Sequence, residues 1–391
     1  MDITITPSPL KGNIAAIPSK SMAHRLLICA AFADKPTSLH CPKTNQDMNA
    51  TANCLTALGA EISHDGRAFR ITPAKAIPSA ATLNCGESGS TLRFMLPIVG
   101  ALGVDATFLL AGRLPQRPLS PLWEEMERMG CRLFWQEENK LRCQGKLQPG
   151  AYRIDGGVSS QFVTGLLFAL SLMNEKSYLS VTGHLESKPY VDMTKQALAS
   201  FGVDPESLGG QTCRSPGNLV VEGDWSNAAF FLAAQALGNE VAVTGLQTDS
   251  RQGDRAVVSL LDSLKKGSCV IDCSHIPDLV PILAVAAGAL NGAVFTNAQR
   301  LRLKESDRIA STGAMLSALG GKWEATDAAL TVYPTGYFGG TVDCAKDHRI
   351  AMSAAIAASI CKAPVTLLGA EAVNKSYPDF WEEYRRLGGI L

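Results

Sequence analysis

The feature that most constrains the fold of this chain is an apolar helical stretch that stops at a glycine and recurs six times. Glycine ends a helix at little cost because it adopts the left-handed backbone conformation that other residues avoid. A strand-like run follows most of these stops, which lie roughly 65 residues apart and therefore predict six similar units. The stops are Gly59, Gly130, Gly202, Gly267, Gly320 and Gly388.

Each unit also contains an earlier helix that is apolar nearly all round, which predicts that this helix is buried. These helices are expected at Ser21–Ala33, Ser90–Leu102, Ser160–Met173, Ser226–Leu237, Pro277–Leu290 and Ile350–Cys361. The helices that end at the glycines carry charges along one side, so we expect them nearer to solvent. Alternating runs between them, such as 60–72 and 322–334, indicate strands or hairpins. We therefore expect an α/β (α+β) fold of βαβαββ-like units, with three units packing their buried helices together in each of two domains.

A solenoid of identical stacked units is the alternative fold. The segments before the buried helices differ too much in their chemistry to favour it. The fourth unit departs from the pattern, because only SCVIDC separates Gly267 from the start of the next helix. This unit is expected to lack a hairpin.

The bulk composition narrows the class of protein. A chain of 391 residues is too long for one ordinary core and predicts two domains. The 36 basic and 36 acidic residues give a net charge of zero, which argues against nucleic-acid and membrane partners. The chain shows no secretory signal and no apolar run near the ~18 residues of a membrane span. Eleven cysteines include no CxxC pair, so we expect reduced thiols in a cytoplasmic protein without a metal or cofactor.

Unusual polar residues gather where the buried helices begin. In IPSKSMAHR, Ser19 or Ser21 can cap the helix, Lys20 lies at its mouth, and Arg25 shares a face with Ser21. This pattern suits a phosphate or carboxylate, because free backbone N–H groups also point outward there. A capped helix with solvated basic residues would give the same pattern.

The second unit carries a glycine-rich turn, CGESGSTLRF, with Gly89 near Arg93. Such a turn lets an anion approach the backbone, although it matches neither the dinucleotide-binding nor the P-loop pattern. The next segment, LPQRPLSPL, places Arg117 between prolines, for which a surface arginine is the alternative.

The later units supply further donors and two acids. Asp278 heads a very apolar helix, where a helix cap is the alternative, and Glu305 lies in the charged run RLRLKESDR, where a solvated face is the alternative. The other polar residues near helix starts are Ser159, Ser160, Gln161, Ser187, Lys188, Tyr190, Lys304, Arg308, Asp347, His348, Arg349 and Lys375. So many cations imply small substrates with several negative charges, and the acids are candidate proton carriers. The residues alone predict a metal-free transferase acting on phosphorylated carboxylates.

The chain resembles the 5-enolpyruvylshikimate-3-phosphate (EPSP) synthase family. The resemblance runs from PSKSMAHR through GESGSTLR, QRPLSPL, SSQFVTGLL, SKPYVDMT, VEGDWSNAAFF, IPD, LRLKESDR and KDHRIAM to NKSYPDFW, nearly the whole chain. It implies transfer of the enolpyruvyl group of phosphoenolpyruvate to the 5-hydroxyl of shikimate 3-phosphate, by addition and elimination through a tetrahedral intermediate. It also implies two inside-out α/β barrels, one at 1–18 plus 224–391 and one at 19–223, with the active site in the cleft between them.

The matched motifs imply roles for individual residues. Catalysis falls to Asp278, which faces the attacking hydroxyl, to Glu305, which protonates the methylene carbon, and to Lys20 as a further proton carrier. The residues implied for shikimate 3-phosphate are Lys20, Ser21, Arg25, Ser159, Ser160, Gln161, Ser187, Tyr190, Asp278 and Lys304. Those implied for phosphoenolpyruvate are Lys20, Gly89, Arg117, Gln161, Arg308, Arg349 and Lys375.

Two positions in the glycine-rich turn bear on these expectations. Glu87 and Ser88 stand where the family often has asparagine and a small residue, so an acid lies beside the phosphoenolpyruvate site or points away from it. Gly89 is retained, and we therefore expect inhibition by glyphosate, which occupies the phosphoenolpyruvate region in this family. A monomer is expected.

Three rival functions remain. A UDP-N-acetylglucosamine enolpyruvyl transferase has the same architecture but typically carries a cysteine in the loop before Arg117, which reads AGRLPQRP here. A catalytically inactive binding module would have lost the lysines and acids of the motifs. An RNA 3′-phosphate cyclase would need a nucleophilic histidine and a basic track, which His348 and the zero net charge do not supply.

Overall fold

The computed structural model describes residues 1–391, which divide into two compact units. Unit 1 comprises Met1–Ile17 and Gly223–Leu391, and unit 2 comprises Pro18–Glu222. Unit 1 is therefore discontinuous in sequence. The predicted boundaries after residues 18 and 223 lie one residue further along the chain.

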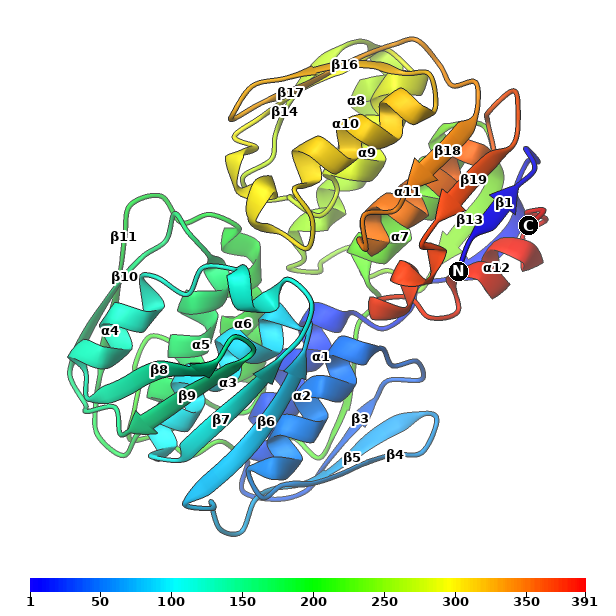
Figure 1. Ribbon diagram of the computed structural model, residues 1–391. Coiled ribbons are helices and arrows are strands. Elements are labelled where there is room, and N and C mark those ends of the chain that lie inside the picture. Colours follow the sequence, from blue (N-terminus) through cyan, green and yellow to red (C-terminus); the bar gives the residue numbers. More distant parts are fainter. The chain divides into compact units, whose positions relative to one another are not determined.

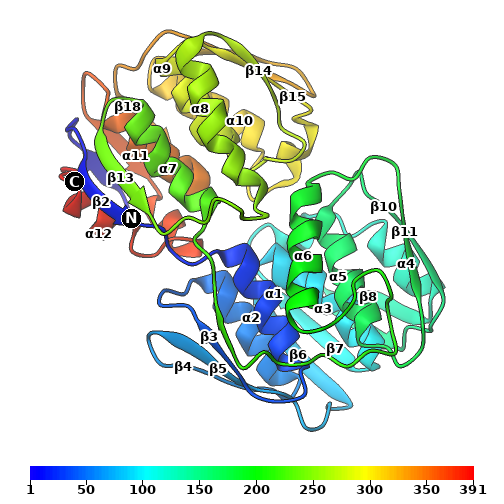
Figure 2. The ribbon, with the colours of Figure 1, turned by 180° about the vertical axis from the view of Figure 1, so that it is seen from behind.

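Unit 2 contains three sheets around buried helices (Figures 1 and 2). Its strands are β3 (Thr37–His40), β4 (Glu61–His64), β5 (Ala68–Thr72), β6 (Ala80–Gly86), β7 (Asp105–Leu110), β8 (Cys131–Glu137), β9 (Lys140–Gly145), β10 (Ala151–Asp155), β11 (Tyr178–Thr182) and β12 (Asn218–Val220). Its helices are α1 (Lys20–Ala31), α2 (Gln46–Ala57), α3 (Gly89–Leu102), the 3-10 turn η1 (Leu114–Gln116), α4 (Leu122–Arg128), α5 (Ser160–Ser171) and α6 (Lys188–Ser200). The sheet orders are β12-β3-β5-β4, β6-β7-β9-β8 and β10-β11.

Unit 1 repeats this scheme. Its strands are β1 (Ile3–Ile5), β2 (Lys11–Ala15), β13 (Glu240–Thr244), β14 (Cys269–Asp272), β15 (Ala293–Thr296), β16 (Lys322–Ala325), β17 (Leu330–Tyr333), β18 (Gly340–Asp343) and β19 (Val365–Leu368). Its helices are α7 (Trp225–Ala236), η2 (Gly253–Ala256), α8 (Val257–Lys266), α9 (Val280–Ala289), η3 (Gln299–Leu303), α10 (Arg308–Ala318), α11 (His348–Ala358), η4 (Ala370–Lys375) and α12 (Phe380–Arg386). The sheet orders are β13-β2, β14-β15-β17-β16 and β1-β19-β18.

Each complete unit of the repeat builds one four-stranded sheet in which a parallel pair is followed by an antiparallel hairpin. In the second unit, β6 pairs parallel with β7 across α3, and the hairpin β8–β9 then joins β7 through β9. A parallel pair needs a long crossover, and a buried helix supplies it here. The starts of the crossover helices therefore follow strand ends, where the polar motifs lie.

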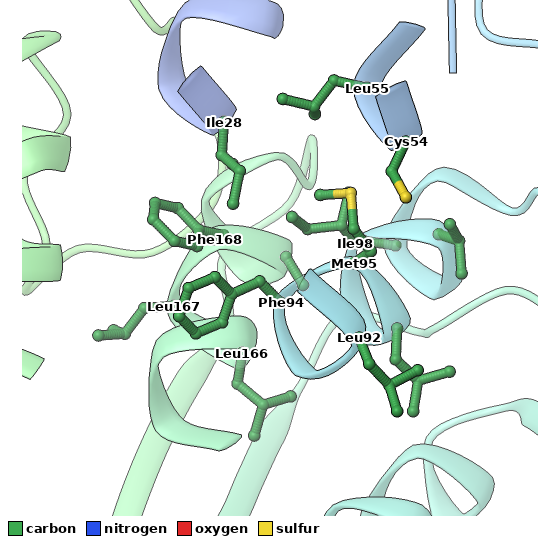
Figure 3. Packing of buried hydrophobic residues seen from close by; sticks show 14 of the residues in the cluster. Ile28, Cys54, Leu55, Leu92, Phe94, Met95, Ile98, Leu166, Leu167 and Phe168 are labelled. Atoms are coloured by element: carbon green, nitrogen blue, oxygen red, sulfur yellow. The ribbon is translucent and has the colours of Figure 1, made fainter. Parts of the chain in front are cut away.

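The six helices expected to be buried are the core of the two units. In α9 every residue from Val280 to Gly288 is buried, and α3 buries all but two of its residues. Figure 3 shows Phe94 of α3 pointing toward α5, and its ring centroid lies 6.0 Å from that of Phe168. A Cβ at Gly165 of α5 would collide with the backbone of α3, so glycine is what lets these two helices approach.

The structure corrects two expectations about the repeats. The fourth unit lacks a hairpin as predicted, but so does the third, where residues 203–217 follow Gly202 without a strand. Gly267 is not left-handed, because its φ of 169° is extended. Gly267 therefore enters β14 in an extended conformation instead of through a left-handed cap.

No helix is both long enough and apolar enough to cross a membrane.

Candidate active site

The first polar cluster of unit 2 lies where α1 begins. Ser19 is the N-cap and accepts a hydrogen bond from the amide of Met22, so Lys20 is the first helical residue and Ser21 does not cap. Lys20 Nζ lies 2.8 Å from Asp47 of α2. Asp47 has no place in the predicted site, and this largely buried ion pair holds the lysine at the start of the helix.

Arg25 is buried one turn further along α1. Its Nε donates to Thr194 (2.9 Å), its Nη1 to the carbonyl of Ser21 (2.6 Å), and its Nη2 to the carbonyl of Tyr190 (2.7 Å). Burial lowers the pKa of Arg25 to about 10, so the side chain remains charged at neutral pH. The structure therefore brings Ser21, Arg25 and Tyr190 together.

The helix starts of the third sequence repeat also lie in structural unit 2. Ser159 caps α5 and accepts a hydrogen bond from the amide of Gln161, while Ser160 is buried in the first turn. Ser187, at the N-cap position of α6, is buried with a left-handed backbone (φ 53°). A serine held in that conformation stores strain, which is typical of a binding position.

Two arginines enclose the glycine-rich turn. A Cβ on Gly89 would lie 2.6 Å from Nη1 of Arg117 and 2.7 Å from Nη1 of Arg93. Arg93 also donates to Gln161 (3.3 Å) and to the carbonyl of Pro118 (3.0 Å). Glycine is therefore required at position 89 for both guanidinium groups to approach the backbone N-terminus of α3. Arg93 completes this group although the predicted site leaves it out.

Glu87 is exposed, and its carboxylate packs against Gly112, where a Cβ would lie 2.5 Å from Oε1. Gly112 belongs to the loop before Arg117. The Glu87 carboxylate thus lies against the loop that leads to Arg117.

A chain of hydrogen bonds between buried side chains holds the glycine-rich turn in place. His24 Nδ1 lies 2.7 Å from Thr51 Oγ1, which lies 2.7 Å from Thr91 Oγ1, and Thr91 donates to the hydroxyl of Ser88 at 2.7 Å. Because the Thr91 hydroxyl donates its hydrogen to Ser88, Thr51 must donate its own hydrogen to Thr91. His24 Nδ1 is therefore protonated and donates a hydrogen bond to Thr51. The neutral imidazole is thereby locked in one tautomer.

This network makes a prediction about stability. Burial lowers the pKa of His24 from 6.5 to about 3, so the folded state excludes a proton that the unfolded chain binds. The stabilising effect of the neutral ring is complete above about pH 6.5 and is lost as the pH falls toward 3. The free energy of unfolding should decrease by up to about 1.4 kcal/mol per pH unit on this account. Urea unfolding of wild type and His24→Asn measures it, and an equal pH dependence in both proteins would contradict the assignment.

The second polar cluster lies in unit 1 and centres on a fully buried arginine. Arg308 is the first residue of α10 and is 1% exposed. Its guanidinium donates to Asp278 (2.6 Å), Glu305 (2.7 Å) and Asp347 (2.9 Å). These three carboxylates raise the pKa of Arg308 despite its burial.

Asp347 was predicted only as a neighbour of Arg349, yet it organises this cluster. It is fully buried, caps α11 through the amide of Arg349 (2.9 Å), and accepts from Ser306 (3.0 Å) as well as from Arg308. Both carboxylate oxygens of Asp347 therefore accept hydrogen bonds. It is a structural counter-ion, and its position one residue before the helix is the sequence signal that indicates it.

Asp278 bridges the two arginines of unit 1. Oδ1 faces Arg308 and Oδ2 lies 3.2 Å from Nη2 of Arg349. Burial disfavours the charged form, but the charges of Arg349, Arg308 and Lys304 outweigh it and hold the pKa well below its usual range. The carboxylate is therefore ionised, the form that a proton acceptor must have, although the same cations weaken it as a base.

Lys304 adds a further charge beside Asp278, Glu305 and Arg308. Burial lowers the pKa of Lys304 to about 8, although Asp278 opposes the change, so Lys304 can exchange a proton near neutral pH. Lys375 is buried at the end of η4. The predicted residues thus divide between the units: Lys20, Arg25 and the glycine-rich turn belong to unit 2, and the acids Asp278 and Glu305 to unit 1.

The fold matches that of solved enolpyruvyl transferases. The structure superposes on EPSP synthase from Acinetobacter baumannii with a TM-score of 0.80 at 23% identity, covering 99% of this chain and 98% of that one. It also superposes on the enolpyruvyl transferase NikO from Streptomyces tendae with a TM-score of 0.76 at 17% identity, covering 99% of this chain and 97% of that one. The fold is that of the enolpyruvyl transferases.

Sequence comparison is more specific. The EPSP synthase (3-phosphoshikimate 1-carboxyvinyltransferase) profile matches residues 5–271 and 262–384. The 3-phosphoshikimate 1-carboxyvinyltransferase of Clostridium kluyveri is 38% identical over 100% of this chain and 98% of its own length. That of Clostridium perfringens is 36% identical over 100% of this chain and 99% of its own length. The chain belongs to the EPSP synthase family, which confirms the family predicted from its motifs.

Proposed function

We propose that this protein transfers the enolpyruvyl group of phosphoenolpyruvate to the 5-hydroxyl of shikimate 3-phosphate in the shikimate pathway. The observation that carries this proposal is the Arg308 cluster, in which Asp278 and Glu305 share Arg308 and Asp278 also pairs with Arg349. One carboxylate can take a hydroxyl proton while the other serves the methylene carbon. The basic helix starts of unit 2 supply the charges that two phosphorylated acids require.

The shikimate 3-phosphate side of the proposal rests on Arg25 and the helix starts near it. Arg25 provides a buried positive charge, while the strained Ser187 and the N-terminus of α5 provide donors for a phosphate. The full set proposed for this substrate is Lys20, Ser21, Arg25, Ser159, Ser160, Gln161, Ser187, Tyr190, Asp278 and Lys304.

The phosphoenolpyruvate side rests on the arginines and on Gly89. The full set proposed for this substrate is Lys20, Gly89, Arg117, Gln161, Arg308, Arg349 and Lys375. Lys20 and Gln161 are assigned to both substrates in this proposal. Donors that are already fixed by the fold need no reorganisation when charge moves, which lowers the barrier.

The proposed reaction balances as an addition followed by an elimination. Glu305 gives a proton to the methylene carbon of phosphoenolpyruvate, the 5-hydroxyl oxygen bonds to C2, and Asp278 takes the hydroxyl proton. The tetrahedral intermediate then loses a methyl proton to Glu305 as the C2–O bond to phosphate breaks. The departing phosphate takes up the proton held by Asp278, with Lys20 as a further carrier.

Glu305 must hold a proton before it can donate one. In this structure it accepts from Arg308 at 2.7 Å, which favours its ionised form. A substrate anion that binds Arg308 competes for that guanidinium and increases the proton affinity of Glu305. In this scheme, binding of phosphoenolpyruvate therefore favours the protonated form of Glu305 that the first step requires.

Several finer features belong to the same proposal. Each unit is an inside-out barrel of three repeats, and the substrates must meet residues of both units for the reaction to occur. The protein acts as a cytoplasmic monomer without a cofactor or metal. The relatives that match over nearly their full length are 3-phosphoshikimate 1-carboxyvinyltransferases. They therefore disfavour the alternative function, a UDP-N-acetylglucosamine enolpyruvyl transferase.

The deciding experiment measures phosphate release from phosphoenolpyruvate with shikimate 3-phosphate or UDP-N-acetylglucosamine as acceptor. Release only with shikimate 3-phosphate is expected. Release only with the nucleotide sugar would overturn the proposal, and silence with both would favour a binding module.

A second prediction concerns Gly89. A methyl group at this position would displace Arg93 and Arg117, since its Cβ would lie within 2.7 Å of both. Gly89→Ala should raise the KM for phosphoenolpyruvate about tenfold, equivalent to ~1.4 kcal/mol of binding free energy, and leave that for shikimate 3-phosphate unchanged. Glyphosate is expected to inhibit the wild type and to inhibit the variant less. Full wild-type turnover at millimolar glyphosate would contradict the proposed inhibition.

A further inference from the structure

Asp254 is a buried carboxylate in η2 that neither the motifs nor the proposed reaction uses. It is 2% exposed, and one of its oxygens accepts a hydrogen bond from the hydroxyl of Ser226. The other oxygen, Oδ1, is buried without a hydrogen-bond partner. An unsatisfied carboxylate oxygen in a protein interior is costly, so its retention calls for a function.

The turn that carries Asp254 is fastened to the start of α7. Gln252 accepts a hydrogen bond from the amide of Trp225 (3.0 Å) and donates to the carbonyl of Gly223 (2.8 Å). Its own amide is held by Ser250 (3.1 Å). These contacts prevent Asp254 from turning out to solvent.

Ser226 connects Asp254 to the cluster of Arg308. While its hydroxyl bonds to Asp254, its carbonyl accepts from Nη1 of Arg349 at 3.1 Å. Nη2 of the same guanidinium reaches Asp278 at 3.2 Å. One residue of α7 thus touches both the unused carboxylate and the arginine that holds Asp278.

The charges around Asp254 come from three elements. Asp278 before α9 and Asp224 at the N-cap of α7 repel its negative form, and Arg349 of α11 attracts it. Within η2, Arg255 donates to the carbonyl of Thr248, and α8 has no titratable group in its first turn. Desolvation, aided by Asp278, raises the pKa of Asp254 to about 7. Its proton is therefore exchanged in the range where enzymes of central metabolism work.

We infer that Asp254 is a positioning residue that orients Arg349 through Ser226 and, when it loses its proton, weakens the hold of Arg349 on the phosphoenolpyruvate anion. The inference rests on the proposed function, because Arg349 is assigned to phosphoenolpyruvate there. When Asp254 is protonated, it does not compete with Asp278 and the substrate for the positive charge of Arg349. Ionised Asp254 competes for that charge and repels an anion.

The pH profile of kcat/KM for phosphoenolpyruvate at saturating shikimate 3-phosphate tests this inference. In the wild type kcat/KM should fall by about fivefold or more as the pH rises through 7, the size of an ordinary coupling between two sites. Asp254→Asn keeps an oxygen for Ser226 and carries no charge, so it should lose this alkaline limb while the KM for shikimate 3-phosphate stays the same. An unchanged limb in Asp254→Asn would overturn the inference.

Two further variants separate positioning from folding. Asp254→Ala leaves Ser226 without its acceptor and should raise the KM for phosphoenolpyruvate several-fold even below pH 6, an effect that the asparagine variant does not share. Asp105→Asn, which removes a partly exposed carboxylate paired with Arg142 in unit 2, should keep the wild-type profile. Loss of stability in both Asp254 variants with a wild-type pH profile would mean a purely structural role.

A measurement that needs no turnover separates this inference from the proposed function. Carboxyl carbon NMR of ¹³C-aspartate-labelled protein should show a resonance that titrates near pH 7 and is missing from Asp254→Asn. Its absence from the wild type would refute the inference whatever the enzyme catalyses. Its presence in a protein that releases no phosphate would refute the proposed function alone.

Discussion

Replacing Glu305 by glutamine is expected to lower kcat for phosphate release by about 10²–10⁴-fold, the usual contribution of a general acid. Glutamine preserves the shape of the side chain and an oxygen for the 2.7 Å contact with Arg308, but it cannot deliver a proton to the methylene carbon. The KM for both substrates should change little, because the binding arginines stay in place. Steady-state phosphate release at saturating substrates measures the effect.

The matched control is Glu324→Gln, which changes an exposed glutamate of β16 in the same unit and should leave kcat unaltered. A loss below threefold in Glu305→Gln would remove Glu305 from proton transfer. Loss of kcat with a proportional rise in KM would instead assign it to substrate binding.

Replacing Arg308 by methionine is expected to lower the free energy of unfolding by about 3–5 kcal/mol, since breaking a buried ion pair leaves charges without compensation. Three carboxylates lose their common partner, and Asp347 is fully buried. Methionine fills much of the same volume, so the cavity left behind contributes little. Denaturant unfolding followed by far-UV circular dichroism measures the change.

Arg142→Met provides the comparison. Arg142 pairs with Asp105 at 2.7 Å, but both side chains are about one-third exposed, so this change should cost only ~0–1 kcal/mol. Equal losses in the two variants would mean that the Arg308 cluster does not stabilise the fold. Because Asp278 and Glu305 lose their partner, Arg308→Met should also abolish activity.

Much of the architecture could be predicted because it depends on local backbone chemistry. A glycine that ends a helix is recognisable from a few neighbouring residues, and five of the six stops have positive φ in the structure. The buried helices were recognisable because they are apolar on every side. The missing hairpin of the third unit was not, because residues 203–217 keep turn-forming residues that fit a loop and a hairpin equally well.

The sites divide in the same way. Lys20, Arg25 and Gln161 are indicated by their places at helix starts, which the chain displays directly. The partners of these residues come from distant segments: Asp47 reaches Lys20 and Asp347 reaches Arg308 only through tertiary packing. Asp254 carries no local sign at all, since an aspartate in a short turn is ordinary until its burial is known.

The discontinuity of unit 1 has a consequence for how the protein is made. Strand β1 pairs with β19, and β2 pairs with β13, so the first strands to leave the ribosome wait for partners synthesised more than half a chain later. All residues of unit 2, by contrast, are available once Glu222 has emerged. Contacts that close such long loops form slowly, and domains complete during synthesis fold first. Unit 2 should therefore be finished while the amino-terminal strands of unit 1 are still unpaired, and those strands are the segment most in need of protection from aggregation in the nascent chain.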